Sequence, residues 1–132
     1  MEQTTKQKGE ISESQVLAAL MRAGYPVLVP FGDNQRYDLV FDDGEALRRV
    51  QVKTGRLRAG SIRFNCASWQ RDSKVKSTYV NQTDYFGVYC PDTCECYLIP
   101  IHDCPSNEMS LRITPTISGQ IRGTNLAEKY RI

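Results

Sequence analysis

Three polar residues on two neighbouring strand-like segments have the spacing of a reactive patch. Asp38 lies within RYDLVF, where a lone carboxylate costs free energy unless it is hydrogen-bonded, ion-paired or bound to a cation. In RRVQVKTG, Gln51 and Lys53 share one face of a strand, while Val50 and Val52 point to the core. The intervening DDGE loop predicts a hairpin in which positions 38 and 51 face each other. An acid, an amide and an amine then share one patch.

The elements that must position this patch follow from the apolar pattern. Apolar residues recur with helical spacing from Ile11 to Ala23, and Gly24 follows where a glycine commonly ends a helix. Residues 67–83 lack a clear period and are expected to form a long loop or a short irregular helix; such loops usually have a function. The tail from residue 118 is expected to dock as an irregular arm or a short helix. Strands are expected at residues 26–30, 36–41, 47–54, 61–66, 85–90, 96–101 and 111–113.

Length and composition indicate one globular domain, residues 1–132. The chain has 132 residues, of which 40% are hydrophobic, and this fits one core rather than two. The longest apolar run, Val16–Met21, is much shorter than the roughly 20 residues that span a bilayer. The polar amino terminus, MEQTTKQKGE, has no secretory apolar region. We therefore expect no membrane association and a cytoplasmic location.

The charge is divided unevenly along the chain. The formal net charge is +2, but residues 46–80 contain nine basic residues and one acidic residue, whereas the remainder contains eight basic and fourteen acidic residues. A contiguous basic segment is typical of a surface that binds a polyanion, because each phosphate that it neutralises releases condensed counterions. The alternative is a solvated basic surface without a ligand.

The five cysteines are an odd number in a chain without a signal peptide, which favours free thiols in a reducing compartment. Cys90, Cys94, Cys96 and Cys104 are close enough in sequence to suggest zinc, but they lack the paired CxxC spacing of structural zinc sites. The alternative is that Cys90 ends a buried strand as a small hydrophobic residue.

The patch and its elements resemble the core of PD-(D/E)XK nucleases, in which strands after a helix present an acid, a second ligand and a lysine. The similarity is particularly clear to the intron-associated PD-(D/E)XK homing endonucleases, whose third motif has glutamine in place of the second carboxylate, as QVK has here. It runs from Lys8 to about Pro100, through RYDLV, VQVKTG and DYFGVYCP, and extends into the GQIRGTNLAEKY tail. The resemblance implies an α/β (α+β) fold with a restriction-endonuclease-like core, an N-terminal helix followed by a mixed central β-sheet.

By motif, the resemblance assigns four catalytic residues. Glu13 of KGEISE matches the helix acid, and Asp38 matches the strand acid. Gln51 and Lys53 match the (D/E)XK pair. Glu10, three residues before Glu13 on the same helix face, competes for the helix position.

Two positions depart from the family pattern. Tyr37 stands where the motif name has proline, which is common in so degenerate a motif. Gln51 carries no charge, which weakens the implied metal site. The structural alternative for Glu13 is a solvated helix acid without a catalytic role. For Lys53 it is a strand lysine whose amine reaches into solvent.

The implied reaction is metal-dependent hydrolysis of phosphodiester bonds by a DNA endonuclease. Mg²⁺ held by hard oxygens neutralises charge on the phosphate and activates water, and Mn²⁺ is expected to substitute. The expected ligands are Glu13, Asp38, the side-chain oxygen of Gln51 and the carbonyl of Val52. Lys53 would stabilise the phosphoryl oxygens or assist the attacking water.

The basic segment 46–80 is expected to bind double-stranded DNA. Its side chains would contact phosphates or read base edges, and Trp69 would either stack on a base or belong to the core. The residues expected to contact DNA are Arg56, Arg58, Arg63, Asn65, Trp69, Gln70, Arg71, Lys74, Lys76 and Tyr79.

The leading interpretation is a site-specific endonuclease of the homing type. A catalytically degenerate DNA-binding module is the alternative, motivated by the neutral Gln51, and a small zinc-binding interaction domain is a third. One domain of this size covers few base pairs, so a homo-oligomer, a dimer or a tetramer, is expected, and the resemblance suggests a tetramer.

Overall fold

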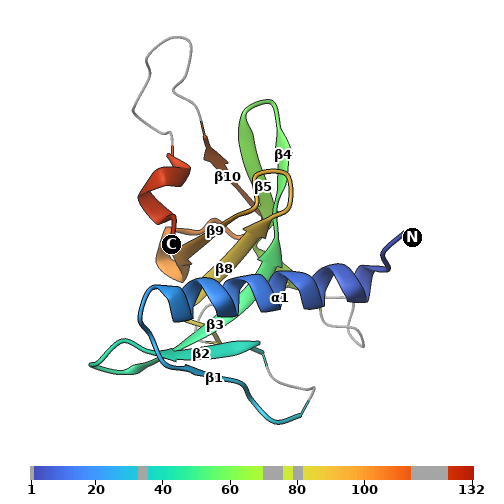
Figure 1. Ribbon diagram of the computed structural model, residues 1–132. Helices are drawn as coiled ribbons and strands as arrows, with labels where there is room; N and C mark the ends of the chain where they lie inside the picture. Colours follow the sequence, from blue (N-terminus) through green and yellow to red (C-terminus); the bar gives the residue numbers. More distant parts are fainter. Residues whose placement is uncertain (1, 33–35, 70–75, 79–81, 114–124) are drawn as a thin grey trace.

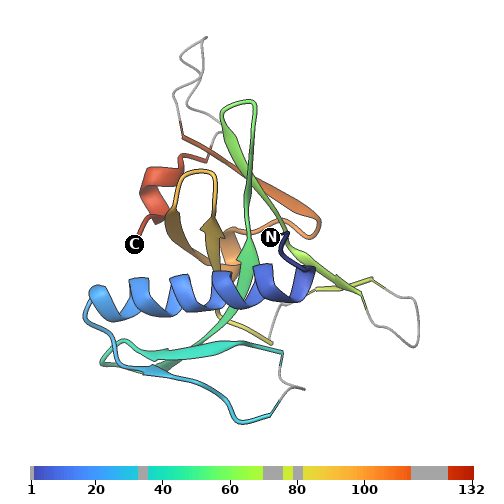
Figure 2. The same ribbon diagram turned by 45° about the vertical axis from the view of Figure 1, so that its right-hand side comes forward.

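Helix α1 and two β-sheets form three successive layers of the computed structural model, which describes residues 2–32, 36–69, 76–78, 82–113 and 125–132 (Figure 1). The helix crosses one face of a five-stranded sheet, and a three-stranded sheet packs on the other face (Figure 2). The central sheet has the order β1-β2-β3-β8-β9, with β1 at Val27–Leu28, β2 at Leu39–Asp42, β3 at Leu47–Thr54, β8 at Tyr85–Cys90 and β9 at Glu95–Pro100. The smaller sheet has the order β10-β5-β4, with β4 at Arg56–Arg58, β5 at Ser61–Asn65 and β10 at Glu108–Arg112.

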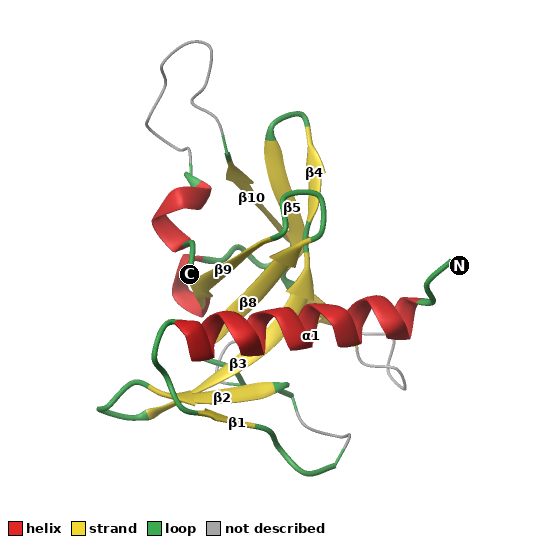
Figure 3. Cartoon of the chain, in the orientation of Figure 1, coloured by secondary structure: helices red, strands yellow, loops and turns green. Residues whose placement is uncertain are grey.

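Shorter elements complete the described chain (Figure 3). Strands β6 (Ala67–Trp69) and β7 (Lys76–Thr78) pair as a separate antiparallel ribbon. One 3₁₀ turn, η1 (Ile101–Asp103), follows β9 directly. A second, η2 (Ala127–Tyr130), lies near the carboxyl terminus. In the central sheet β3 and β8 run parallel, whereas the other neighbouring strands are antiparallel. The expected mixed sheet after an N-terminal helix is therefore confirmed.

Helix α1 (Thr5–Arg22) begins earlier than its apolar spacing predicts. Its first turn is fixed by a capping box instead: the Gln7 N–H donates to Thr4 Oγ1, and the Thr4 N–H donates to Gln7 Oε1. The expected glycine end is correct, because Gly24 has a φ of +96° just past the helix. Within the described residues, no helix combines the length and the apolar character needed to cross a membrane.

The β2–β3 hairpin sets the register of the patch. Leu39 pairs with Val50, so continuing the ladder by one residue places Asp38 opposite Gln51, as the sequence predicts. The DDGE loop forms the turn, where Asp43 Oδ1 accepts hydrogen bonds from the N–H groups of Glu45 and Ala46.

Two apolar clusters hold the three layers together. Residues of α1, represented by Val16 and Leu20, pack on the face of the central sheet that carries Val50 and Val52. The opposite face of β8 and β9 packs against the smaller sheet, and Phe86 lies with its ring centroid 5.8 Å from that of Phe64. The alternation within β3 therefore directs Gln51 and Lys53 away from α1.

Several strand boundaries differ from the expectation. The strand expected at 36–41 begins only at Leu39, and the one expected at 26–30 is the two-residue β1. The RLRAG turn contains strand β4, because Ala59 and Gly60 adopt positive φ angles and close a tight hairpin. The long loop expected at 67–83 contains β6 and β7, and much of the tail lies outside the described residues.

Close packing of α1 on β8 generates a testable prediction. A Cβ atom at Gly87 would lie 2.7 Å from Val16 Cγ1 and 2.9 Å from Val50 Cγ1. Gly87→Ala is expected to lower the free energy of unfolding by about 1–3 kcal/mol, because the helix must shift to admit the methyl group. Gly9→Ala is the matched control, since its Cβ meets nothing within 4 Å and alanine favours the helix. Urea unfolding of both variants measures the effect, and equal stabilities would contradict it.

Candidate active site

Asp38 is held at the point where the β2–β3 hairpin begins. Its N–H donates to the Val50 carbonyl at 2.8 Å. Its Oδ2 accepts the Val52 N–H at 2.8 Å and Gln51 Nε2 at 2.9 Å. Asp38 thus lies one residue before β2 rather than inside a strand, and it is half-buried. The sequence predicts Asp38 inside a strand. In the structure the Asp38 carboxylate, rather than a backbone carbonyl, accepts the Val52 N–H, and the β2–β3 ladder begins at Leu39.

Glu13 reaches the same carboxylate from helix α1. Its side chain shares a hydrogen bond with that of Asp38. Burial, the shared hydrogen bond and the negative charges of Asp38 and Glu10 together raise the pKa of Glu13 to about 7. The helix is fixed at this point because Ser12 Oγ lies 2.6 Å from Thr54 Oγ1 at the end of β3. Motif reasoning did not identify this Ser12–Thr54 hydrogen bond.

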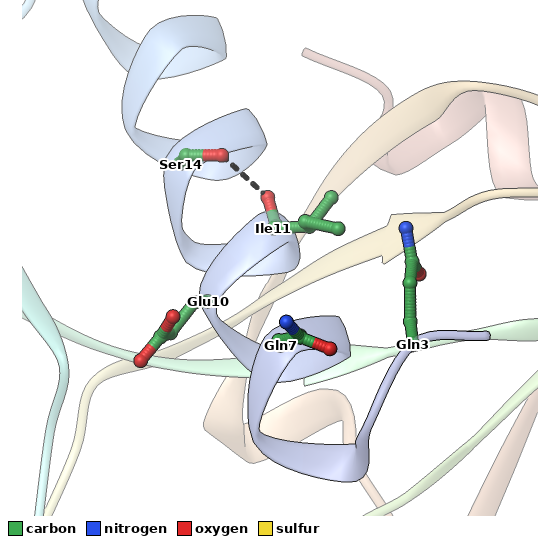
Figure 4. A pocket seen from close by; sticks show the side chains of 5 residues that line it. All are labelled: Gln3, Gln7, Glu10, Ile11 and Ser14. Carbon is green, nitrogen blue, oxygen red and sulfur yellow. Dashed lines mark hydrogen bonds between the residues drawn. The ribbon is translucent and has the colours of Figure 1, made fainter. Parts of the chain in front are cut away.

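The geometry separates the two competing helix acids. Glu10 is exposed and lines a surface hollow of about 300 Å³ together with Gln3, Gln7, Ile11 and Ser14. Figure 4 shows the Glu10 carboxylate on the side of the helix away from Gln3. Glu10 affects Glu13 through its charge, whereas Glu13 makes the hydrogen bond to Asp38. The structure therefore favours Glu13 over Glu10 as the helix acid of this cluster.

Gln51 and Lys53 extend the cluster along β3. Gln51 donates a hydrogen bond to Asp38 from its amide nitrogen, so its amide oxygen takes no part in that bond. Lys53 Nζ lies 5.7 Å from the ring centroid of Phe86, on the face of β3 that points away from α1. Val52 between them is buried against the helix, and its backbone belongs to the same site through Asp38. The structure thus connects Glu13, Asp38, Gln51 and Val52 by hydrogen bonds, and it places Lys53 two residues after Gln51 on the same face of β3.

The donor set of this cluster suits a hard divalent cation. Two carboxylates and one amide supply oxygen atoms, which Mg²⁺ and Mn²⁺ prefer to sulfur or nitrogen. Burial and the neighbouring Asp38 raise the pKa of Glu13 to about 7, so the pair favours a bound positive charge, which a proton or a cation could supply. In the described residues no set of three His, Cys, Asp or Glu side chains could hold a metal ion. A metal at this site would therefore depend on the amide, backbone and water oxygens as well as the two acids.

The five arginines of segment 46–80 that lie before residue 64 divide into two groups. Arg48 Nε lies 2.6 Å from Asp43 Oδ2, and Arg49 donates to both carboxylate oxygens of Asp84 at 3.2 Å. These two arginines are neutralised by acids from outside the segment. The second group, Arg56, Arg58 and Arg63, lies on the smaller sheet.

The remaining residues expected to contact DNA fall partly outside the described part of the chain. Gln70, Arg71, Lys74 and Tyr79 lie outside the described residues. Trp69 pairs with Lys76 through the backbone of the β6–β7 ribbon. Asn65 is exposed at the end of β5, and its side-chain oxygen accepts the Ala67 N–H at 2.9 Å, which stabilises the bend between β5 and β6.

The cysteines considered as zinc ligands do not converge in the structure. All five are free thiols. Cys90 packs in the cluster between the two sheets, whereas Cys96 packs in the cluster beneath α1. Cys90 is fully buried at the end of β8, as expected of a small hydrophobic residue.

The fold and the acid cluster define a nuclease of the restriction-endonuclease type. A bacterial homing endonuclease, I-Ssp6803I, has a similar structure, with a TM-score of 0.77 and 28% sequence identity over 98% of this chain and 89% of that chain. The Holliday junction resolvase Hjc of Archaeoglobus fulgidus aligns with a TM-score of 0.48 and 16% identity over 92% of this chain and 94% of that chain. No curated protein matches the chain by sequence.

The sequence matches the PD-(D/E)XK endonuclease family over residues 3–132, so the chain belongs to this family. It is a DNA endonuclease, and the resemblance stated from the motifs is confirmed. Nucleases of this family generally depend on divalent metal ions.

The raised pKa of Glu13 gives a pH-dependent stability. The folded state holds a proton on Glu13 up to about pH 7, whereas the unfolded state releases it near the ordinary value of 4.5. The contribution of Glu13 is therefore fully present below about pH 4.5 and lost as the pH rises to about 7. In metal-free buffer, we expect a loss of about 1 kcal/mol across this range, because solvent screens a half-exposed group.

Urea unfolding between these pH values, with a chelator present, measures this contribution as the difference between the wild type and Glu13→Gln. Glu10→Gln is the control and should follow the wild-type pH profile closely. A Glu13→Gln profile parallel to that of the wild type would contradict the shared proton.

Proposed function

We propose that this chain is a metal-dependent endonuclease that hydrolyses phosphodiester bonds in double-stranded DNA at a specific site, as homing endonucleases do. The observation that carries the proposal is the hydrogen-bonded cluster of Glu13, Asp38 and Gln51, with Lys53 two residues after Gln51 on β3. Its similarity to a bacterial homing endonuclease supports the site-specific activity. Residues 1–132 act as one domain in this proposal.

The cluster would hold Mg²⁺, for which Mn²⁺ would substitute. Its ligands would be the carboxylates of Glu13 and Asp38, the side-chain oxygen of Gln51 and the carbonyl of Val52. Once bound, the ion supplies Lewis-acid stabilisation of the phosphate and lowers the pKa of a bound water. The hydrogen bond from the Val52 N–H orients Asp38 for this role, because it fixes one carboxylate oxygen and leaves the other to accept a ligand.

Lys53 would act on the phosphate rather than on the metal. Its ammonium group is a point charge with three donors, suited to the non-bridging oxygens on which charge develops during cleavage. The contact of its Nζ with the face of the Phe86 ring, 5.7 Å from the ring centroid, limits the conformations of the side chain. A preorganised charge of this kind stabilises the transition state without reorganisation during the reaction.

Gln51 decides between the proposed enzyme and a binding module with a degenerate nuclease core. A neutral amide leaves the site with two carboxylates, which favours weak metal binding in the absence of DNA. Its hydrogen bond to Asp38 supports a role within the site rather than on the surface. We therefore propose that the amide both orients Asp38 and offers its oxygen to the cation.

The basic residues would hold the DNA against this site. Phosphate contacts are proposed for Arg56, Arg58 and Arg63 of the smaller sheet and for Lys74 and Lys76. Base or phosphate contacts are proposed for Asn65, Trp69, Gln70, Arg71 and Tyr79.

A homo-oligomer, a dimer or a tetramer, is proposed because one domain spans few base pairs. Exposed apolar side chains support an assembly: Val29 is 66% exposed and Phe31 is fully exposed after edge strand β1.

Asp38→Ala is expected to lower cleavage of plasmid DNA in Mg²⁺ by about 100-fold or more, because the acid holds the cation at the scissile phosphate. DNA binding should persist, since the substitution removes a negative charge. Asp38→Asn keeps an acceptor for the Val52 N–H and separates loss of charge from loss of the hydrogen bond.

Asp42→Ala is the matched control for these variants, because Asp42 lies at the other end of β2 and accepts the Gly44 N–H in the hairpin turn. Circular dichroism checks the fold of each variant. Wild-type cleavage by folded Asp38→Ala would refute the metal-holding role, and a wild-type protein that binds DNA without cleaving it would favour the binding module.

Substitutions of Gln51 test its proposed dual role. Gln51→Glu should lower the Mg²⁺ concentration needed for half-maximal cleavage, because a third carboxylate adds negative charge to the site. Gln51→Leu should abolish cleavage, because it removes both the oxygen and the donor to Asp38. Titration of Mg²⁺ against the cleavage rate measures both effects. The same metal dependence in wild type and Gln51→Leu would end the assignment of Gln51 as a ligand.

A further inference from the structure

Two of the five cysteines meet beside the smaller sheet. Cys66 follows β5 and is 3% exposed, whereas Cys104 follows η1 and is half-buried. Cys66 belongs to the apolar cluster between the two sheets, and Cys104 packs against that cluster. Their side chains share a hydrogen bond. The two thiols are therefore in contact, although they lie far apart in the sequence.

Backbone hydrogen bonds hold the chain on both sides of this contact. The Cys66 N–H donates to the Asn107 carbonyl at 2.7 Å, which closes the loop between Cys104 and β10 against the end of β5. At the start of that loop, the Cys104 N–H donates to a carbonyl of η1 at 3.1 Å. Sγ of Cys104 also lies 3.5 Å from the Pro100 carbonyl oxygen, so the thiol is turned toward the sheet. The fold itself thus keeps the two sulfurs together.

The other three cysteines are placed differently. Cys90 and Cys96 pack in different clusters on opposite faces of the central sheet. Cys94 is exposed on the turn between β8 and β9. These positions give no reason to expect a bridge, in contrast to those of Cys66 and Cys104.

The surroundings of the pair favour one negative charge on it. A hydrogen bond from Cys104, opposed by burial and aided by the positive charge of Lys53, lowers the pKa of the Cys66 thiol. The same hydrogen bond, together with burial, raises the pKa of the Cys104 thiol. Loss of one proton therefore makes loss of the second harder, and the pair combines a thiolate with a thiol. A thiolate is the nucleophile in thiol oxidation, and a neighbouring thiol can resolve the oxidised sulfur.

We propose that Cys66 and Cys104 form a reversible disulfide when the protein meets a hydroperoxide. This inference goes beyond the proposed nuclease function and does not depend on it. The partial exposure of Cys104 admits a small oxidant to the pair. A dithiol returns both thiols by exchange through a mixed disulfide.

The oxidation balances with one molecule of hydrogen peroxide for each disulfide. The thiolate sulfur attacks one peroxide oxygen, the O–O bond breaks, and the departing hydroxide takes the proton lost when the thiolate formed, which gives water. The second sulfur then attacks the resulting sulfenic acid and forms the S–S bond. The hydroxyl group leaves as a second water with the proton of the second thiol. The two sulfurs lose two electrons, which the peroxide accepts.

The bridge would fasten the bend between β5 and β6. Across Cys66, the Asn65 side-chain oxygen accepts the Ala67 N–H, and the β6–β7 ribbon begins at Ala67. This ribbon is part of the segment proposed above to bind DNA. Because β5 and β10 are neighbouring strands (Figure 1), an S–S bond to Cys104 ties the start of the ribbon to the loop before β10.

Peptide mapping of the oxidised protein tests the proposal. The full chain is treated with limiting hydrogen peroxide in a chelator, unfolded in iodoacetamide to block the remaining thiols, and digested without reduction for mass spectrometry. We expect a linked pair of peptides that contain Cys66 and Cys104. Two of the five thiols should be lost, and all five should return after dithiothreitol. The oxidised protein should also unfold at a higher temperature than the reduced protein, because the bridge restricts the unfolded chain.

Two serine variants make the test specific. Cys104→Ser should form no bridge with Cys66, and peroxide should not raise its unfolding temperature. Cys94→Ser is the matched control and should behave as the wild type does. In peroxide-treated wild type, alkylation of both Cys66 and Cys104, or a bridge that involves Cys94, would overturn the proposal, and this result requires no variant to fold.

The outcomes are independent of the proposed function. A protein that cleaves plasmid DNA but forms no Cys66–Cys104 bridge overturns this inference alone. A protein that forms the bridge and, when reduced, neither binds nor cleaves DNA rejects the proposed function alone.

Discussion

The contact between the carboxyl groups of Glu13 and Asp38 is the constraint on which the site depends. Two acids placed together at neutral pH repel each other, and burial of one of them adds to the cost, as the raised pKa of Glu13 shows. Such a pair persists only where the surrounding fold holds both side chains. Here Ser12 fixes the helix to Thr54, and the Val52 N–H fixes the opposing carboxylate.

The packing of α1 on the central sheet makes this contact possible. Gly87 leaves room for Val16 and Val50, so the helix lies close enough for Glu13 to reach the hairpin. Strand β3 then continues past β2 to pair in parallel with β8. The β2–β3 pairing therefore ends beside the two acids. The remaining part of β3, which carries Lys53, extends beyond the end of β2. The fold thus presents charge on an open edge rather than inside a closed sheet.

Local pattern was enough to predict the elements that carry the site. Alternation located β3 and β8 at their observed bounds, and the hairpin turn correctly placed Asp38 opposite Gln51. The local pattern did not predict the boundaries of elements that depend on hydrogen bonds rather than on apolar spacing. The start of α1 is set by a side-chain cap in an entirely polar stretch, and Asp38 precedes β2 because its carboxylate pairs with the Val52 N–H. Neither bond leaves a periodic signal in the sequence.

The distribution of charge on the surface was the property that the sequence predicted least well. A run of basic residues in the sequence does not show which of them pair with acids in the folded protein. Arg49 stands in the basic run, yet Asp84 from a distant strand binds it through two oxygens and removes it from the available charge. Arg112 stands far from the basic run in sequence, yet the β5–β10 ladder pairs it with Ser61 on the strand that also carries Arg63. The electrostatic surface of this endonuclease is therefore set by strand pairing. Helix packing brings the acids of the cluster together, whereas strand pairing decides which acids and bases lie side by side on the rest of the surface.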